Sequence, residues 1–260
     1  NDAPALKAAD IGIAMGVNGT AVTREAASMV LADDNFASIV RAVEEGRVVF
    51  DNIVKFVRFQ LSTNIGAMLT VLAATLAGMP APFTAIQLLW INIIMDGPPA
   101  MTLGIEPARA GIMRDTPRNQ AADILTPARL GRLALYGLTM TVGTLWLFQF
   151  ALAERGQTYA LTLAFTTFVL FQFFNVFNAR NEHGSAFNAQ FFRNGKLWLA
   201  LAGVLVMQGV AVHWPPAQAI FGSTDIAAAD WLKAVLVASS VLLLDEARKL
   251  IRRLLKSELR

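Results

Sequence analysis

One acidic residue inside an apolar stretch is the feature of this sequence best suited to chemistry. Residues 84–103 form a run long and apolar enough to cross a bilayer, yet the run contains Asp96 and, four residues earlier, Asn92. A helix would place these two side chains on the same face. A carboxylate at bilayer depth costs about 2.5–3.5 kcal/mol, and a bound cation is the simplest way to offset that cost.

The sequence Gly97-Pro98-Pro99 directly follows Asp96. Two prolines have no backbone N–H to donate, so carbonyl oxygens one turn earlier lose their partners. Such oxygens beside a carboxylate are ligands for a hard cation, and interrupted transmembrane helices are where transporters place ion sites. Two other interpretations stay open: Asp96 pairs with a basic residue of a neighbouring helix, and the prolines make a simple kink.

Further polar residues are expected at membrane depth. Asn64 lies in the preceding apolar stretch, where it either supplies a ligand oxygen facing Asp96 or bridges helices through hydrogen bonds. Gln172, Asn175 and Asn178 form a stripe with a spacing of three among phenylalanines. Such a stripe is more typical of helix packing than of a binding site.

The composition is that of a membrane protein. The chain has 260 residues, of which 55% are hydrophobic and only 16% are charged, against roughly 25% charged residues in soluble proteins. The absence of cysteine excludes disulfides, thiolate metal sites and cysteine nucleophiles. The net charge of +3 fits the basic loops of a membrane protein and does not indicate a nucleic-acid partner.

Apolar runs predict six membrane spans, each near the required length of roughly 17–25 residues. The predicted spans are 59–79, 84–103, 133–152, 159–177, 197–213 and 231–244. The first span continues a polar stalk helix at 36–58. Because no proline occurs between Phe36 and Pro80, one long helix is predicted, with a bend at Gly46 as the alternative.

Loop charges orient these spans. With the stalk in the cytoplasm, the loops 104–132 and 178–196 and the tail 248–260 carry fourteen Lys and Arg residues, whereas the opposite side carries only Arg155. This asymmetry follows the positive-inside rule and predicts that both chain ends lie in the cytoplasm. The basic amphipathic tail either lies against anionic lipid at the inner membrane surface or acts as an autoinhibitory or partner-binding segment.

Residues 1–45 are predicted to be soluble. Two short strands, at 11–15 and 30–31, flank a helix, and the cluster Asp33-Asp34-Asn35 consists of good N-cap residues for the stalk helix. So short a segment cannot form an independent α/β domain. It is therefore interpreted as the end of a domain whose beginning precedes this sequence.

Several motifs resemble those of P-type cation-transporting ATPases. The residues 1–6 (Asn-Asp-Ala-Pro-Ala-Leu) and 9–16 (Ala-Asp-Ile-Gly-Ile-Ala-Met-Gly) look like the hinge motif that closes the phosphorylation domain of that family, and 29–36 continues the match. Residues 89–100 resemble the sixth membrane helix of calcium pumps. The similarity is greatest to the secretory-pathway calcium/manganese subgroup and its bacterial relatives, and 57–63 agrees with it.

The resemblance implies a mainly α, polytopic membrane protein. Its six transmembrane helices would be the fifth to tenth of a ten-helix pump, preceded by the C-terminal tail of an α/β phosphorylation domain. The implied parts are the end of this HAD-like domain (1–45), the cytoplasmic stalk helix (36–58), the first two membrane helices with the ion site (59–103), a cytoplasmic loop (104–132), a four-helix membrane bundle (133–247) and a basic cytoplasmic tail (248–260).

The resemblance also implies the ion ligands. The family's ligands in the sixth helix fall on Asn92 and Asp96, and its asparagine in the fifth helix falls on Asn64. Two-site reticulum calcium pumps have three more ligand positions, which hold Ala67, Met95 and Gln172 here. Their loss implies one ion per cycle.

Asp2 matches an acid near the Mg2+ and phosphoryl group of the family's phosphorylation site, with Asn1 beside it. The phosphorylated aspartate, the nucleotide-binding domain and the first four helices, including a ligand glutamate, have no counterpart in this sequence. The chain is therefore expected to be a C-terminal part that is not catalytically competent alone.

The intact protein is expected to use Mg2+ and ATP to export Ca2+, or Mn2+, from the cytoplasm. Its expected partners are the lipid bilayer, the transported divalent cation and the N-terminal part of the pump, with no nucleic acid. The composition favours a bacterial inner membrane. The alternatives are a pump for Na+, K+ or protons and a non-enzymatic six-helix channel or carrier, which would lack an upstream Asp-Lys-Thr-Gly-Thr motif.

Overall fold

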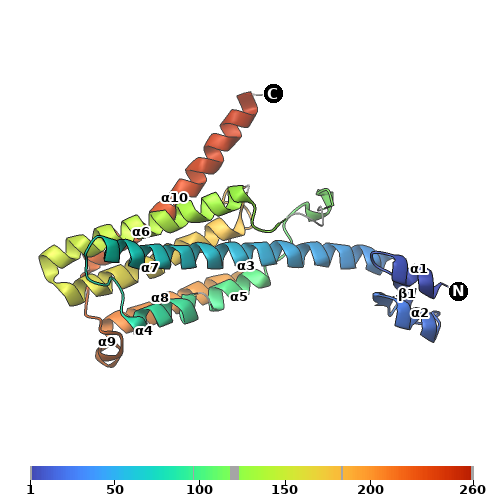
Figure 1. Cartoon of the computed structure of the whole chain (residues 1–260), viewed down its shortest axis with the longest axis horizontal. Helices are drawn as coiled ribbons and strands as arrows, with labels where there is room; N and C mark the ends of the chain where they lie inside the picture. The colour runs from blue at the N-terminus through green and yellow to red at the C-terminus, as the bar shows by residue number, and fades with distance from the viewer. Residues whose placement is uncertain (1, 96, 118–122, 183, 259–260) are drawn as a thin grey trace. The chain divides into compact units, whose positions relative to one another are not determined.

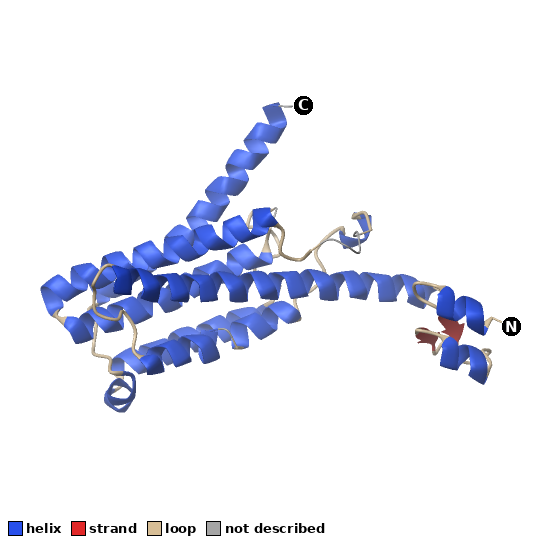
Figure 2. Ribbon diagram, in the orientation of Figure 1, coloured by secondary structure: helices blue, strands red, loops and turns tan. Residues whose placement is uncertain are grey.

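The computed structural model describes residues 2–95, 97–117, 123–182 and 184–258 and forms two compact units. Unit 1 comprises Asn1–Asp51 and Ala108–Pro117, and unit 2 comprises Asn52–Pro107 and Arg118–Arg260. Most described residues are helical, which confirms the mainly α fold (Figures 1 and 2). The elements are α1 (Ala3–Ala8), β1 (Ile13–Met15), α2 (Ala21–Ala26), β2 (Met29–Leu31), α3 (Ala37–Leu76), α4 (Ala85–Trp90), η1 (Ile91–Met95), α5 (Pro98–Gly104), η2 (Ile112–Arg114), α6 (Pro127–Arg155), α7 (Gln157–Arg180), α8 (Gly195–His213), α9 (Pro215–Phe221) and α10 (Ala228–Glu258).

The small sheet of unit 1 has two parallel strands. Ile13 of β1 lies opposite Met29 of β2, and Met15 lies opposite Leu31. Helix α2 connects the strands, as a parallel pair requires a crossover connection. Both predicted strands and the helix between them are therefore present.

The acidic cluster before α3 has two different roles. Asn35 accepts a 2.9 Å hydrogen bond from the backbone N–H of Ala37 in the first turn of α3, as predicted for a cap. Asp33 accepts a 2.7 Å hydrogen bond from the hydroxyl of Ser38 and so contacts the first turn through a side chain. Asp34 instead accepts hydrogen bonds from the backbone N–H groups of Val17 (2.9 Å) and Asn18 (2.8 Å), which lower the pKa of its carboxyl. The prediction that Asp34 caps the helix is wrong, because its carboxylate closes the loop after β1.

Helix α3 is a single element of 40 residues with no break at Gly46. The predicted long helix is therefore confirmed. A helix of this length measures about 60 Å, twice the hydrocarbon thickness of about 30 Å. The part of α3 beyond Arg58, which carries no charged residue, is long enough to cross most of a bilayer.

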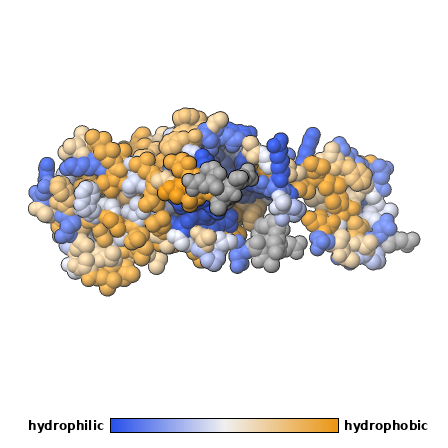
Figure 3. All heavy atoms as spheres, turned by 90° about the horizontal axis from the view of Figure 1, so that it is seen from above, coloured by the Kyte–Doolittle hydropathy of each residue, from blue (hydrophilic) through white to orange (hydrophobic). Residues whose placement is uncertain are grey.

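Four helices in the described part of the chain are long and apolar enough to span a membrane, namely α3, α6, α7 and α8. The remaining two predicted spans correspond to the interrupted segment α4–η1–α5 and to the first half of α10. Leu76, Leu199 and Val206 are 66–79% exposed. Much of the visible surface over the long helices of unit 2 is hydrophobic (Figure 3), which is rare in soluble proteins and is expected where lipid replaces water.

Helix α7 is the central helix of unit 2. It packs against α6 and α10, and 83% of its most apolar 18-residue segment is buried. Helices α3 and α6 approach closely at Gly137, where a Cβ atom would lie 2.6 Å from Cγ2 of Ile65. Glycine at a crossing lets membrane helices pack closely, so Gly137 positions α3, which carries Asn64.

Candidate cation site

The segment that contains Asp96 is an interrupted helix. Helix α4 starts with a capping box, in which Thr84 and Gln87 exchange hydrogen bonds of 3.1 and 3.2 Å between side chain and backbone. The backbone changes to a π-helix at Ile91 and resumes as an α-helix at Pro98. A Cβ atom at Gly97 would collide with the carbonyl oxygen of Ile93, so a residue with a side chain would not fit there.

The predicted ligands Asn64 and Asn92 are both exposed on the surface of unit 2. Neither side chain forms a hydrogen bond with another residue that the structure describes. Asp96 lies outside the described residues, as does Asn1. Asp2 is exposed, and its side chain does not cap α1.

The polar stripe of α7 divides into two kinds of residue. Asn175 donates a 2.7 Å hydrogen bond to Ser62 of α3, and Asn178 donates a 2.9 Å hydrogen bond to the carbonyl of Val241 in α10. These two residues join helices, as predicted for packing residues. Gln172 is completely buried, yet neither its amide nitrogen nor its oxygen has a partner among the described residues. The α7 helix contacts η1, so one unsatisfied amide lies on a helix that borders the interrupted segment.

A buried ion pair fixes the end of α5. Glu106 accepts hydrogen bonds from Arg180 at the end of α7 (2.6 and 3.0 Å) and from Asn194, the N-cap of α8 (2.5 Å). Asn52 of α3 donates to the backbone carbonyl of Glu106 at 2.8 Å. Because Glu106 follows α5 directly, these contacts hold one end of the interrupted segment against α3, α7 and α8.

A second ion cluster surrounds Glu182, just beyond α7. Arg129 of α6 binds both carboxylate oxygens at 2.9 Å, Arg132 also pairs with the carboxylate, and Arg58 of α3 lies 3.8 Å away. Arg58 is nearly buried and donates to the carbonyl oxygens of residues 178 and 179 (3.1 and 3.2 Å). The last carbonyls of a helix have no partner within the helix, so Arg58 caps α7 from a neighbouring helix.

A third acidic residue holds the start of the tail. Asp245 is buried in α10, accepts a hydrogen bond from Tyr136 of α6, and pairs with Arg248 and Lys249 at 2.7 and 2.8 Å. We call Glu106, Glu182 and Asp245, together with their partners, the boundary network. Its acids lie just after α5, just after α7 and in α10, and Arg129 and Arg132 lie in the first two turns of α6.

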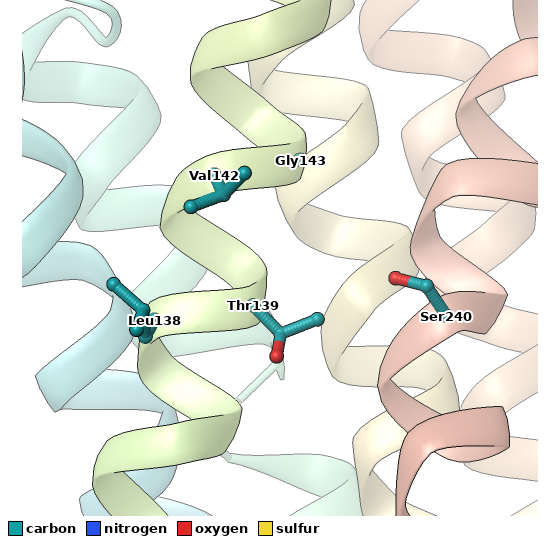
Figure 4. A pocket seen from close by; sticks show the side chains of 5 residues that line it. All are labelled: Leu138, Thr139, Val142, Gly143 and Ser240. Atoms are coloured by element: carbon teal, nitrogen blue, oxygen red, sulfur yellow. The ribbon is translucent and has the colours of Figure 1, made fainter.

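A pocket of 320 Å³ opens between α6 and α10. It is lined by Leu138, Thr139, Val142 and Gly143 of α6 and by Ser240 of α10 (Figure 4). The lining is almost entirely apolar and contains no ionisable group. The pocket therefore offers no charged ligand to a cation.

Comparison with known proteins identifies the family. Residues 80–251 match the family described as "Cation transporting ATPase, C-terminus". The chain belongs to the cation-transporting ATPases. The family match covers the interrupted segment, α6 to α9 and most of α10. The fold of unit 2 is thus the membrane region of a cation-transporting ATPase.

Several cation-transporting ATPases named as calcium-transporting are similar to the chain. It is 43% identical over 252 residues to calcium-transporting ATPase type 2C member 2 of Mus musculus, which is 96% of this chain and 27% of the relative. It is also 43% identical to calcium-transporting ATPase 1 of Saccharomyces cerevisiae (96% and 26% covered) and 41% identical to the human type 2C member 1 (97% and 28%). The predicted resemblance to this calcium-pump subgroup is confirmed.

The chain spans about a quarter of the length of these cation-transporting ATPases. It is an integral, multi-pass membrane protein. The relatives are from eukaryotes and give no support to the predicted bacterial inner membrane. That prediction rested on residue composition, which reflects the genome as well as the membrane.

The boundary network contains the site residues that sequence reasoning missed. Arg129, Arg132 and Arg180 were assigned only to loop charge, although each pairs with an acid at least 50 residues away. The available signal was that Glu106, Glu182 and Asp245 each lie within five residues of the end of a predicted span. An acid near the end of a membrane span, among basic residues, indicates a basic partner.

The Glu182 cluster makes stability depend on pH. Burial alone would raise the pKa of Glu182, but hydrogen bonds from Arg129 and the charges of Arg58, Arg129 and Arg132 lower it from 4.5 to about 2. Because the unfolded state then binds the proton more tightly, the stabilisation is fully present above pH 4.5 and is lost as pH falls towards 2. Thermal unfolding of the wild type and Glu182→Gln should differ most at neutral pH and converge under acid conditions; parallel pH profiles would contradict this.

Proposed function

We propose that this chain is the C-terminal membrane part of an ATP-driven pump that exports Ca2+ from the cytoplasm, with Mn2+ as the alternative cargo. Asn92 and Asp96 bind the ion. The proposal rests chiefly on one observation, namely the π-helix and the helix restart at Pro98 on either side of a carboxylate in an apolar segment. The type 2C relatives, which are named as calcium-transporting, support the choice of ion.

The alternative, a fixed pair between Asp96 and a basic residue, finds no partner within this chain at membrane depth. The apolar segments 59–105, 133–154, 156–179 and 197–212 contain no Lys or Arg. In α10, Lys233 pairs with Asp230 at 2.8 Å. A carboxylate without a basic partner at bilayer depth favours a cation as its counter-charge.

One ion per cycle is proposed, because the family's further ligand positions hold Ala67, Met95 and the neutral Gln172. Gln172 can offer an amide oxygen, since both of its polar atoms are buried without a described partner. Asn64 and Asn92 are exposed here. In the intact pump, the part N-terminal to this chain would cover them and supply the remaining ligands.

Unit 1 is proposed to be the end of the phosphorylation domain, with Asp2 near the Mg2+ that accompanies ATP and Asn1 beside it. Helix α3 runs from unit 1 into unit 2 and would act as the stalk that transmits the change at the phosphorylation site. Such coupling requires that phosphorylation favour one of two arrangements of the ion site. The asymmetry of the loop charges supports a cytoplasmic position for both chain ends.

The proposal is tested by measuring ATP hydrolysis of the full-length protein with Ca2+, Mn2+, Na+ or K+ as the only added transport ion. Ca2+ is expected to stimulate hydrolysis, and Mn2+ to do so if it is also cargo. Stimulation by Na+ or K+ alone would contradict the choice of ion. Ion flux through the reconstituted protein without any ATP hydrolysis would contradict the pump and support a channel or carrier.

Asn92→Ala should raise the Ca2+ concentration for half-maximal ATP hydrolysis by at least about tenfold. Even residues that only hydrogen-bond to a metal ligand change metal affinity 10–100-fold, and Asn92 is proposed as a ligand itself. Gln157→Ala is a matched control, since it removes the exposed side-chain amide of the first residue of α7. An unchanged calcium dependence of Asn92→Ala would remove Asn92 from the proposed site. Hydrolysis at saturating Ca2+ separates weak binding from a failure to fold.

A further inference from the structure

The end of α10 extends beyond the membrane span. Helix α10 has 31 residues and measures about 46 Å, against a hydrocarbon thickness of about 30 Å. Asp245, held by the boundary network, marks the polar end of the span. We call residues 248–258 the tail helix. Figure 1 shows this red end of α10 leaving the bundle obliquely to α6 and α7.

The tail helix has an exposed apolar side. Leu250, Ile251, Leu254 and Leu255 are each 56–57% exposed. At 100° per residue, these four positions fall within an arc of about 140°. Leu236 and Leu243, which are 60–62% exposed in the span itself, lie on the same side of the helix. The lipid-facing stripe of the span therefore continues into the tail helix and does not end at the boundary network.

The opposite arc of the tail helix is basic. Arg248 and Lys249 are paired with Asp245, and they fix the start of the tail helix. Arg252 and Arg253, one turn later, are exposed and form no ion pair with a described residue. The sequence that follows adds Lys256 and Arg260 against a single acid, Glu258. Two arginines without an acidic partner lie beside an apolar stripe. This combination complements a membrane surface, which has anionic headgroups outside and apolar acyl chains inside.

We propose that the tail helix lies in the interfacial layer of the cytoplasmic leaflet and binds anionic phospholipid there. Arg252 and Arg253 contact the headgroup phosphates, and the side with Leu250 and Leu254 enters the acyl boundary. The oblique course of the helix brings it towards the membrane plane, and its apolar stripe joins that of the span. This inference goes beyond the proposed transport function and holds for any cargo.

The 260 residues contain no cysteine, so one cysteine introduced among them gives a unique label in a protein whose upstream cysteines, if any, have been replaced. Leu255→Cys, carrying an environment-sensitive fluorophore, is reconstituted into vesicles of phosphatidylcholine alone or with added phosphatidylglycerol. In the anionic vesicles the emission should shift to the blue and be quenched by brominated acyl chains, and added salt should reverse both effects. Leu199→Cys on α8, which is 75% exposed, is the control and should be quenched equally in both vesicles.

Replacing both free arginines tests the charge. Arg252→Gln with Arg253→Gln should lower the ratio of buried to exposed probe in anionic vesicles by about 25-fold, since each basic residue near such a surface contributes about fivefold. Three results would overturn the proposal. The first is a probe that stays exposed to solvent in both kinds of vesicle. The second is a probe that is equally buried in both but not quenched by brominated lipid, because it then docks on the protein. The third is an unchanged ratio of buried to exposed probe in the double variant. A probe at Ile251→Cys repeats the measurement on the same side of the helix.

Discussion

Asp96→Asn in the full-length protein should abolish calcium-dependent phosphorylation by ATP. The substitution keeps the size of the side chain and removes the charge that compensates a divalent cation at bilayer depth. Removing a residue that only hydrogen-bonds to a metal ligand already lowers metal affinity 10–100-fold. Asp96 is the one carboxylate of the proposed site, so its loss should cost more than about 100-fold in apparent Ca2+ affinity.

The measurement is the amount of phosphoenzyme formed from labelled ATP over a Ca2+ series. Asp225→Asn is the matched control, because Asp225 is an acid with a 72% exposed side chain outside the long helices. It should leave the calcium dependence unchanged. If Asp96→Asn retains the wild-type calcium dependence, Asp96 is not a ligand and the proposed cation site is refuted, whatever the identity of the family.

Glu182→Gln should lower the free energy of unfolding by about 3–5 kcal/mol. The carboxylate holds three arginines, two from α6 and Arg58 from α3, and its own side chain is only 12% exposed. Removing one partner of a buried pair leaves uncompensated charge, which costs far more than a surface pair. At roughly 2–4 °C per kcal/mol for chains of this size, the unfolding temperature should fall by about 6–20 °C.

Glu154→Gln is the matched control for this substitution, because Glu154 is an exposed acid near the far end of α6. Its unfolding temperature in the same detergent should stay within about 1 °C of the wild type, as expected for surface positions. A Glu182→Gln protein as stable as this control would mean that the three arginines are satisfied by water, and the cluster would then have no structural role.

Most of the fold could be predicted from the pattern of apolar residues. Long runs without proline predicted α3, and Gly97-Pro98-Pro99 predicted the interruption of the second membrane segment, since a missing N–H breaks a helix wherever the chain lies. These features depend on residues within a few positions of one another. The short helix α9 lies between the predicted spans 197–213 and 231–244 and was not predicted, although Pro215 and Pro216 open it and proline is favoured in the first turn of a helix.

Pairings between distant residues could not be obtained in this way. Spacing alone placed Asn175 on a stripe but could not show that Ser62, 113 residues earlier, receives its hydrogen bond. It also grouped Gln172 with Asn175, although only Asn175 has a partner in the described structure. The sequence predicts a cap at Asp34 because aspartate is favoured both at helix caps and in turns that close loops.

The arginine that caps α7 restricts how this region can move. Shear of α3 along α7 would strip two buried carbonyl oxygens of their donor and leave the Arg58 guanidinium without acceptors. Each lost group costs about 1–3 kcal/mol, and more when charge is involved. Tilting of α3 and α7 as one block preserves every one of these contacts. Pivoting is therefore the motion of low energy for this pair, and sliding is the motion of high energy.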